Sequence, residues 1–392
     1  MRADATGIEA IPAPARSTVA PARKAGDRLV RLECLRGFAA LYVFVVHIAQ
    51  YVVKPEGLLA WPFKFGQEAV MLFFLISGFV IFYSYEVASD KSFGGYLLRR
   101  FRRIYPIFLL ALGLSALLRA NDGSFDVRTL LGNLFMLQDF SATKPGVWFN
   151  YYGGNTPLWS LSYEWWFYML FFPIRTRLPE AVQKYVVFGL GAVAIAVYQA
   201  WPNQISLFLG YFMIWWTGVE MARAYCRGRS VGIMPVLLMA LTVFGFFVPV
   251  WLTLLRGASA TTIGHVLLEH RYASFHPALE FRHTSFAFAA VVVGLVWQRL
   301  GWRGFDAIFS VFSKVAPISY GIYVLHLPIV TSTLLSGLPL PVEVAGYVAA
   351  TVILATLAEG PFQQWVNRLL SPSGRRRPRL TVGGPLQNAV EP

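Results

Sequence analysis

Three ionisable side chains lie within long apolar stretches of this sequence. They are two histidines, His47 and His326, and Glu164, which is the only charged residue between positions 156 and 174. Ionisable groups are costly inside lipid, so each marks a candidate functional site. A carboxylate beside a histidine forms a general-base pair, because it orients the imidazole and stabilises the protonated ring. The residue types therefore predict proton abstraction, with an imidazole as the base and Glu164 as the group that orients it.

If these stretches are helices, their spacing brings the three side chains to a similar depth. His47 follows Arg36 by eleven residues, a rise of about 16 Å, which reaches the midplane of an apolar core about 30 Å thick. His326 lies eleven residues into its own stretch, and Glu164 lies eight residues beyond Thr156, about 12 Å deep. We therefore predict one site that contains His47, Glu164 and His326.

Each of these residues also has a purely structural interpretation. A single histidine inside a membrane often bonds to a neighbouring helix. Glu164 is also free to pair with an arginine, and its neighbours Tyr163, Trp165 and Trp166 are compatible with an aromatic packing face. The sequence leaves these alternatives open.

The segment LLRRFRRIYP carries four arginines just before an apolar stretch that begins at Ile104. One interpretation is anchoring at the membrane surface, where positive charge contacts anionic lipid. The other is an anion clamp, because Arg100 and Arg103 are three residues apart and share a helix face. Paired guanidinium groups bind phosphates in a bidentate fashion, so a cytosolic cofactor with several phosphates suits this position.

The composition indicates what kind of chain must position these residues. Of the 392 residues, 56% are hydrophobic and only 14% are charged, whereas a soluble domain carries about 25% charged residues. The aromatic content of 16% excludes a disordered chain, and the two cysteines exclude a disulfide framework. What remains is a helical protein that crosses a membrane several times.

Ten stretches with few or no charges approach the width of a bilayer, so we predict an all-α bundle of about ten transmembrane helices. The predicted spans are 37–53, 69–85, 104–118, 156–174, 185–201, 203–219, 231–255, 284–298, 315–336 and 344–370. Placing both ends of the bundle on the cytoplasmic side assigns 26 of the 34 Lys and Arg residues to cytoplasmic segments, as the positive-inside rule requires. The net charge of +14 is therefore a topology signal, and no nucleic-acid partner is predicted.

The expected organisation is one membrane domain, residues 29–370, between two cytoplasmic tails, 1–28 and 371–392, that are predicted to be disordered. The outer loop 256–283 contains four histidines whose spacings match no standard metal-ligand pattern, and no cysteine is nearby. These histidines are His265, His270, His276 and His283. We therefore predict no metal site.

Six motifs, in the same order, resemble those of the membrane-bound acyltransferase family 3. They are LECLRGFAALYVFVVHIAQ with Arg36 and His47, FFLISGFVI with Ser77, RRFRRIYP with Arg100 and Arg103, TPLWSLSYEWWFYML with Glu164, SYGIYVLHLPI with His326, and AEGPF with Glu359. The resemblance covers residues 30–365 of the chain.

The resemblance implies an enzyme that transfers an acyl group, commonly acetyl, from cytosolic acyl-CoA to a hydroxyl of a cell-surface polysaccharide or lipid-linked sugar. It implies that His47 is the catalytic base and that the cytoplasmic arginines, Arg36, Arg100 and Arg103, hold the CoA donor. A thioester is already an activated acyl donor, so acyl-CoA is the expected co-substrate and no metal is needed. The implied location is the bacterial inner membrane, with a carbohydrate acceptor and polysaccharide-assembly proteins as partners.

Other functions and another mechanism stay open at this point. A transporter or flippase for a lipid-linked carbohydrate would use ionisable groups at mid-depth for proton coupling. A scaffold subunit of a polysaccharide export complex would not need them. Within the enzymatic account, His47 acts either as a general base or as the carrier of a covalent acyl group.

Overall fold

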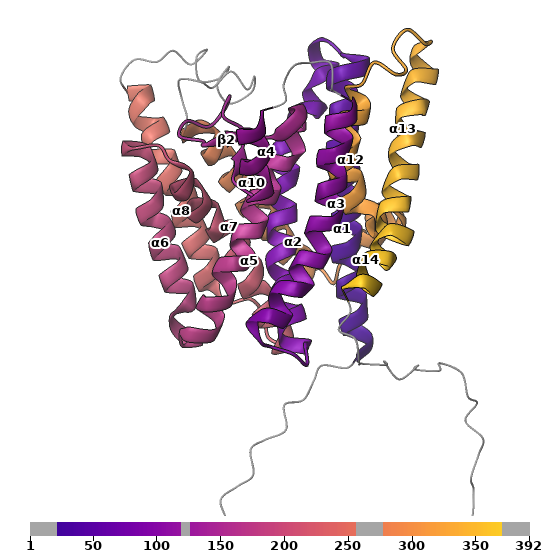
Figure 1. The fold of residues 1–392 in the computed structure, drawn as a ribbon. Helices are drawn as coiled ribbons and strands as arrows, with labels where there is room; N and C mark the ends of the chain where they lie inside the picture. Colours follow the sequence, from indigo (N-terminus) through magenta and orange to yellow (C-terminus); the bar gives the residue numbers. More distant parts are fainter. Residues whose placement is uncertain (1–21, 119–125, 256–276, 371–392) are drawn as a thin grey trace, which may run out of the picture.

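The computed structural model describes residues 22–118, 126–255 and 277–370, and most of them are helical (Figure 1). The long helices lie side by side between two ends of the molecule, and α1 begins at the lower end in Figure 1. The helices of seven or more residues are α1 (Ala22–Ile48), α2 (Gly66–Val87), α3 (Phe93–Leu118), α4 (Val127–Leu134), α5 (Trp159–Arg177), α6 (Glu180–Ala200), α7 (Gln204–Cys226), α8 (Ile233–Leu255), α10 (Pro277–Arg299), α12 (Ser319–Val330), α13 (Leu340–Leu357) and α14 (Gln363–Leu369), with the 3-10 helix η2 (Gly57–Lys64) between α1 and α2.

Within the described ranges, seven helices are long and apolar enough to cross a membrane, or eight if Phe305–Lys314 and Ala316–Val330 form one bent span. The predicted all-α, multi-pass class is confirmed. Each of the ten predicted spans falls on a helical segment of the structure, and seven or eight of these meet the length and composition of a membrane span. Helices α1 and α5 occupy the first and fourth predicted spans without being among the seven. Both helices contain charged residues, and both carry residues of the predicted site, His47 in α1 and Glu164 in α5. The orientation in the membrane stays a prediction.

Helices α2 and α7 pack backbone against backbone at two glycines. A Cβ atom at Gly78 would lie 1.9 Å from the carbonyl oxygen of Trp215, and one at Gly218 would lie 2.0 Å from that of Leu75. Small residues permit this close approach between helices in membranes. The contact also positions Ser77, whose hydroxyl oxygen accepts a 3.1 Å hydrogen bond from the Trp215 indole.

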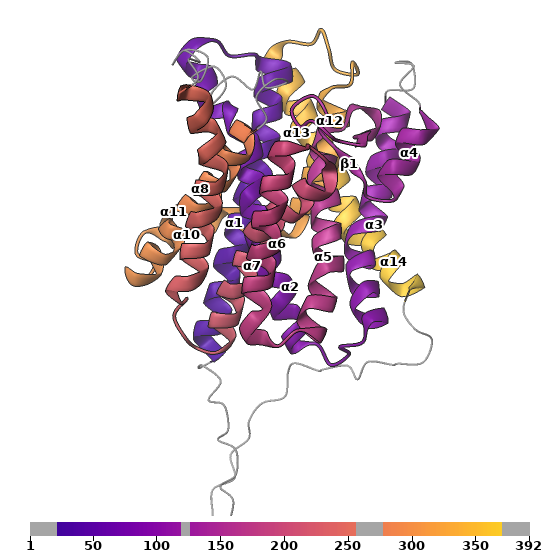
Figure 2. The same ribbon diagram turned by 90° about the vertical axis from the view of Figure 1, so that its left-hand side faces the viewer.

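Residues 126–158, which precede α5, form a small cap at the upper end of the bundle (Figures 1 and 2). After α4 it contains β1 (Gln138–Asp139), β2 (Phe149–Asn150), and the 3-10 turns η4 (Tyr152–Gly154) and η5 (Thr156–Leu158). The two strands pair in parallel, and they are the only strands among the residues that the structure describes. The cap leads directly into α5.

Irregular helical segments interrupt the bundle close to predicted site residues. The π-helix η1 (Ala49–Val53) continues α1 just beyond His47, and the π-helix η8 (Ala358–Phe362) contains Glu359 and Pro361. The short turn η7 (Ala316–Ile318) precedes α12 at a bend of 48°. Single π-turns inside helices are frequent at functional sites.

Helices extend beyond the apolar runs at several predicted boundaries. Helix α10 begins at Pro277, so His283 lies in a helix and not in the predicted loop. The predicted cytoplasmic segment 299–314 contains α11 (Phe305–Phe309) and η6 (Ser310–Lys314), and α1 begins at Ala22, inside the predicted tail. For α1 and α10 a charge ends the apolar run without ending the helix, whereas α11 is a separate short helix after α10 ends at Arg299. The rest of the two tails and three of the loop histidines, His265, His270 and His276, lie outside the described residues.

Candidate active site

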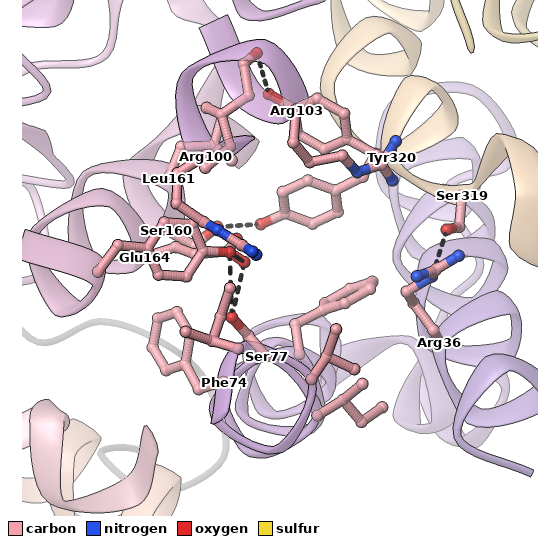
Figure 3. A pocket seen from close by; sticks show the side chains of 17 residues that line it. Arg36, Phe74, Ser77, Arg100, Arg103, Ser160, Leu161, Glu164, Ser319 and Tyr320 are labelled. Carbon is pink, nitrogen blue, oxygen red and sulfur yellow. Dashed lines mark hydrogen bonds between the residues drawn. The ribbon is translucent and has the colours of Figure 1, made fainter. Parts of the chain in front are cut away.

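All three predicted cofactor-binding arginines line one cavity of about 220 Å³, which we call the inner cavity (Figure 3). Arg36 reaches it from α1, and Arg100 and Arg103 reach it from α3. Glu164 of α5 and Ser77 of α2 also line it, and Figure 3 shows them bonded to each other beside Arg100. The arrangement brings together charges from helices that are far apart in the sequence.

Carboxylates hold two of these arginines in place. Nη1 of Arg103 lies 2.5 Å from the Glu359 carboxylate, which also accepts a 3.1 Å hydrogen bond from the backbone of Gly321. Arg36 forms an ion pair of 2.5 Å with Glu33 and donates a 3.1 Å hydrogen bond to the hydroxyl of Ser319. Each guanidinium is therefore fixed in position before any ligand arrives.

Arg100 differs from the other two because no carboxylate pairs with it among the described residues. It is 9% exposed, and it donates a 3.0 Å hydrogen bond to the hydroxyl of Ser84. Its guanidinium carbon lies 5.5 Å from the ring centre of Tyr96 and 5.9 Å from that of Tyr168. The Nε atom of Arg100 has no hydrogen-bond partner. This guanidinium therefore keeps both charge and donor capacity for an anion.

Glu164 belongs to the inner cavity, which corrects the prediction that it orients His47. Its carboxylate accepts a 2.8 Å hydrogen bond from Ser77 and a second from the hydroxyl of Tyr168. The side chain faces α2 and the arginines, whereas His47 lines a different cavity. Similar depth along two helices does not make two side chains face each other.

A second cavity of about 190 Å³, the outer cavity, contains His47. It lies toward the cap, and Gln50, Gln67 and Thr143 contribute polar groups to its wall. The ring of Tyr323 lines both cavities, so the two spaces meet at this residue. Its hydroxyl lies 2.8 Å from the hydroxyl of Ser160, which lines the inner cavity.

His47 and His326 form a hydrogen-bonded pair that fixes where each neutral ring carries its proton. Nδ1 of His47 lies 2.8 Å from Nε2 of His326, and Nδ1 of His326 lies 2.8 Å from the carbonyl oxygen of Ile322. A carbonyl oxygen can only accept, so His326 carries its proton on Nδ1 and uses Nε2 as an acceptor. His47 must then donate through Nδ1–H, and its Nε2 keeps the lone pair. The result is a neutral base oriented by another imidazole.

A buried ion pair within the cap contacts α5 of the bundle beside the outer cavity. Nζ of Lys144 lies 2.9 Å from the Asp139 carboxylate, and both side chains are fully buried. The hydroxyl of Tyr163 donates a 2.5 Å hydrogen bond to Asp139, and Lys144 lies 3.6 Å from the ring centre of Trp159. Burial lowers the pKa of Lys144, and the Asp139 carboxylate opposes that shift. Because Thr143 and Trp159 line the outer cavity, the ion pair also fixes part of its wall.

The described residues contain no cluster of three side chains that could hold a metal ion. His283 is fully buried, and its Nδ1 lies 2.6 Å from the hydroxyl of Tyr211 in the core of the bundle.

Two residues at the site have partners that sequence reasoning did not assign. Glu359 belongs to the AEGPF motif, and an acidic residue in an apolar run is the signal that predicts an ion-pair partner, but its pairing with Arg103 spans 256 positions. Tyr323 lies three residues before His326 in the SYGIYVLHLPI motif, and nothing in its sequence context indicates that it lines two cavities.

Comparison with known proteins identifies an acyltransferase domain. The family model for this domain, acyltransferase family 3, matches residues 29–360. No solved structure matches the chain.

Three curated proteins illustrate the similarity. The chain is 32% identical over 184 residues to the acyltransferase MdmB of Streptomyces mycarofaciens, covering 43% of this chain and 46% of the relative. It is 30% identical over 186 residues to nodulation protein 10 of Rhizobium leguminosarum bv. viciae, covering 43% and 49%. It is also 30% identical over 165 residues to protein 2 in the picA locus of Rhizobium radiobacter, covering 35% and 78%. The chain thus spans about half the length of the first two relatives.

Proposed function

Because this chain belongs to acyltransferase family 3, whose model it matches over residues 29–360, we propose that it transfers an acyl group, in the first instance acetyl, from acyl-CoA to a hydroxyl of a carbohydrate. The chain is a multi-pass membrane acyltransferase. We propose the identity of the acyl donor, the identity of the acceptor and the catalytic role of each site residue.

The inner cavity is the proposed site of the CoA donor. Arg36, Arg100 and Arg103 direct guanidinium groups to one space, and guanidinium groups bind phosphate oxygens with charge-assisted hydrogen bonds. Arg100 is expected to contribute most, because it has no carboxylate partner in the described part of the chain. From Arg36 to His47 the acyl-bearing arm has to cover about 16 Å along α1.

His47 is the proposed general base. Its Nε2 carries the lone pair, since Nδ1 donates to His326. As the acceptor hydroxyl attacks the thioester carbon, its proton moves to Nε2 of His47 and a new C–O bond forms. The C–S bond then breaks, and the CoA thiolate takes up the proton that His47 holds. His326 would act as a positioning residue that keeps the base in the correct tautomer.

The junction between the cavities is the proposed place of the reacting carbonyl. Ser160 and Tyr323 share a hydrogen bond there, and hydroxyl donors of this kind stabilise the negative oxygen of a tetrahedral intermediate. Tyr323 lines both spaces, so it can contact a thioester on one side and an alcohol on the other. Direct transfer needs no covalent intermediate, whereas acyl-His47 trapped in the absence of acceptor would instead support the covalent relay.

The cellular setting is part of the same proposal. With the arginine cavity on the cytoplasmic side, acyl-CoA enters from the cytosol and the acceptor enters through the outer cavity. We propose the bacterial inner membrane as the location, and polysaccharide-assembly proteins as partners that present the acceptor.

The observation that carries the proposal is an oriented neutral imidazole next to a cavity lined by three arginines. The test uses the full-length protein in lipid nanodiscs with radiolabelled acetyl-CoA and a panel of carbohydrates. We expect label on a sugar hydroxyl, and we expect His47→Gln to abolish transfer while CoA binding persists. Full activity of His47→Gln would refute the assignment of the base.

The same preparation separates the enzyme from a transporter. CoA affinity is measured against salt concentration in the wild type and in Arg100→Ala. An enzyme with this donor site should bind CoA in a salt-dependent manner and lose affinity in the variant. A transporter or flippase for a lipid-linked sugar has no need for CoA and should show no such binding.

A further inference from the structure

A third cavity adjoins the outer cavity and plays no part in the mechanism above. Its volume is about 430 Å³, and it lies between the end of α1, the end of α12 and the start of α13. Tyr51 and Thr156 line both this space and the outer cavity. We call it the side cavity. A molecule that reacts at His47 can therefore extend into it.

The polar groups of the side cavity are mainly hydrogen-bond acceptors. The hydroxyls of Thr331 and Ser332 already donate to backbone carbonyls of α12, at 2.8 and 2.7 Å, and that of Ser336 donates to Thr333 at 2.8 Å. The hydroxyl of Tyr347 also donates, to the carbonyl of Ser332 at 2.8 Å. With their protons committed, these oxygens are left with lone pairs.

Glu343 adds the carboxylate of a half-buried side chain to the same wall. None of the described residues that line the side cavity is a lysine or an arginine. A phosphate or another anion would find one negative charge and few donors, which disfavours its binding. A lipid tail would leave the polar oxygens without partners, which is also costly.

The ligand that matches such a wall is a neutral molecule with many O–H donors. A sugar ring has several hydroxyls at its edge and apolar C–H groups on its faces. Vicinal hydroxyls can donate to the Glu343 carboxylate, and the rings of Tyr51 and Tyr151 offer flat surfaces to the C–H faces. A volume of about 430 Å³ is within the usual range of ligand pockets, which is about 300–1,000 Å³.

We propose that the side cavity is a subsite for the neutral sugar ring next to the one that is acylated, so that the acceptor is an oligosaccharide or polysaccharide and not a single sugar. This inference rests on the proposed function, because it takes the hydroxyl that reacts at His47 to belong to a carbohydrate. Glu343 and Tyr151 are its specificity residues, and neither contacts the His47–His326 pair.

The test measures binding without chemistry, so that it stands apart from the transfer assay. Full-length protein in nanodiscs is titrated with two sets of probes, the methyl glycosides of glucose, galactose and mannose and the corresponding β-linked or α-linked homodisaccharides, and binding is followed by saturation-transfer NMR. We expect at least one disaccharide to bind about tenfold more tightly than its methyl glycoside. We expect Glu343→Gln and Tyr151→Ala each to remove that gain while leaving binding of the methyl glycoside unchanged.

The matched control is Glu56→Gln, which removes a carboxylate from an exposed position on the same side of the molecule. It should keep the gain. Equal binding of both probe sets in the wild type, a gain that survives both variants, or the absence of binding by every sugar would each overturn the subsite. The proposed function is judged separately in the transfer assay. Acetyl transfer to a carbohydrate, together with no disaccharide gain in the wild type, would keep the enzyme and reject only the subsite.

Discussion

The inner and outer cavities of this protein meet at one tyrosine, yet one is lined by charged side chains and the other by neutral ones. The inner cavity contains three guanidinium groups and the Glu164 carboxylate, whereas none of the described residues that line the outer cavity carries a formal charge. Two of the inner arginines are neutralised in place by Glu33 and Glu359. In the outer cavity the reactive group is instead oriented by a neutral imidazole and a backbone carbonyl.

The difference indicates how one helical bundle can both bind a polyanionic donor and hold a neutral general base. A polyanionic carrier is bound best by fixed positive charges. A general base needs a free lone pair, and neighbouring positive charges would make proton uptake by an imidazole more costly. Two cavities that share Tyr323 allow the arginines to bind the carrier in one cavity and keep the neutral base in the adjoining one. The following predictions change one cavity at a time.

The largest expected effect is in the outer cavity. His47→Ala removes the base, and we expect kcat to fall by about 10²–10⁴-fold. The dissociation constant for CoA should stay within twofold, because the inner cavity is untouched. Steady-state transfer kinetics and CoA binding on the same preparation provide the check. A parallel loss of CoA binding would mean that the two cavities are not separate sites.

The next largest effect is on stability, and it concerns the cap, which lines part of the outer cavity. Lys144→Met leaves the Asp139 carboxylate buried without its partner, and we expect a loss of about 3–5 kcal/mol in unfolding free energy. Thermal unfolding in detergent measures it, with the exposed Lys54→Met as the control. The double variant Asp139→Leu/Lys144→Met should recover most of the loss. If Lys144→Met alone is as stable as the wild type, the ion pair does not hold the cap.

Within the inner cavity, Arg100→Met should weaken CoA binding by about 10–100-fold, the value of a hydrogen bond to a charged group. The salt dependence of binding should also become shallower. Arg99→Met removes the same charge from the neighbouring position, which does not line the cavity, and should change affinity far less. Equal effects of the two variants would favour general attraction to the membrane surface over a clamp.

The smallest effect is expected for a conservative change behind the base. In His326→Gln the amide oxygen can accept from His47 and the amide nitrogen can donate to the Ile322 carbonyl, so we expect only about a tenfold fall in kcat. His326→Leu removes the acceptor, and kcat should then approach that of His47→Ala. KM for acyl-CoA should be unchanged in both. Similar kcat values for the glutamine and leucine variants would show that the tautomer is not set by this bond.

The sequence was a good guide to the helices and to the class of protein. Apolar runs located the spans, because a segment in lipid must satisfy its own backbone groups in a helix. The boundaries were less reliable. Helix α10 starts seven residues before its predicted span at Thr284, since the residues between are polar enough to end an apolar run but still form a helix in the assembled bundle.

For the site, the sequence determined which residues carry the chemistry and roughly how deep they lie. It identified the three arginines, Glu164 and both histidines, because ionisable groups are costly in lipid and therefore mark functional sites. The rise of 1.5 Å per residue then fixed one coordinate of each side chain, its height.

Only the tertiary structure decided which of these residues meet. His47 pairs with His326, 279 positions away, and Glu164 pairs with Ser77, 87 positions away, although similar depth had suggested that His47 and Glu164 belong together. Height along a helix says nothing about rotation around its axis, and rotation is set by packing such as the close contact at Gly78 and Gly218. Partners, cavities and the tautomer of the base all depend on that second coordinate, which arises only when the helices assemble.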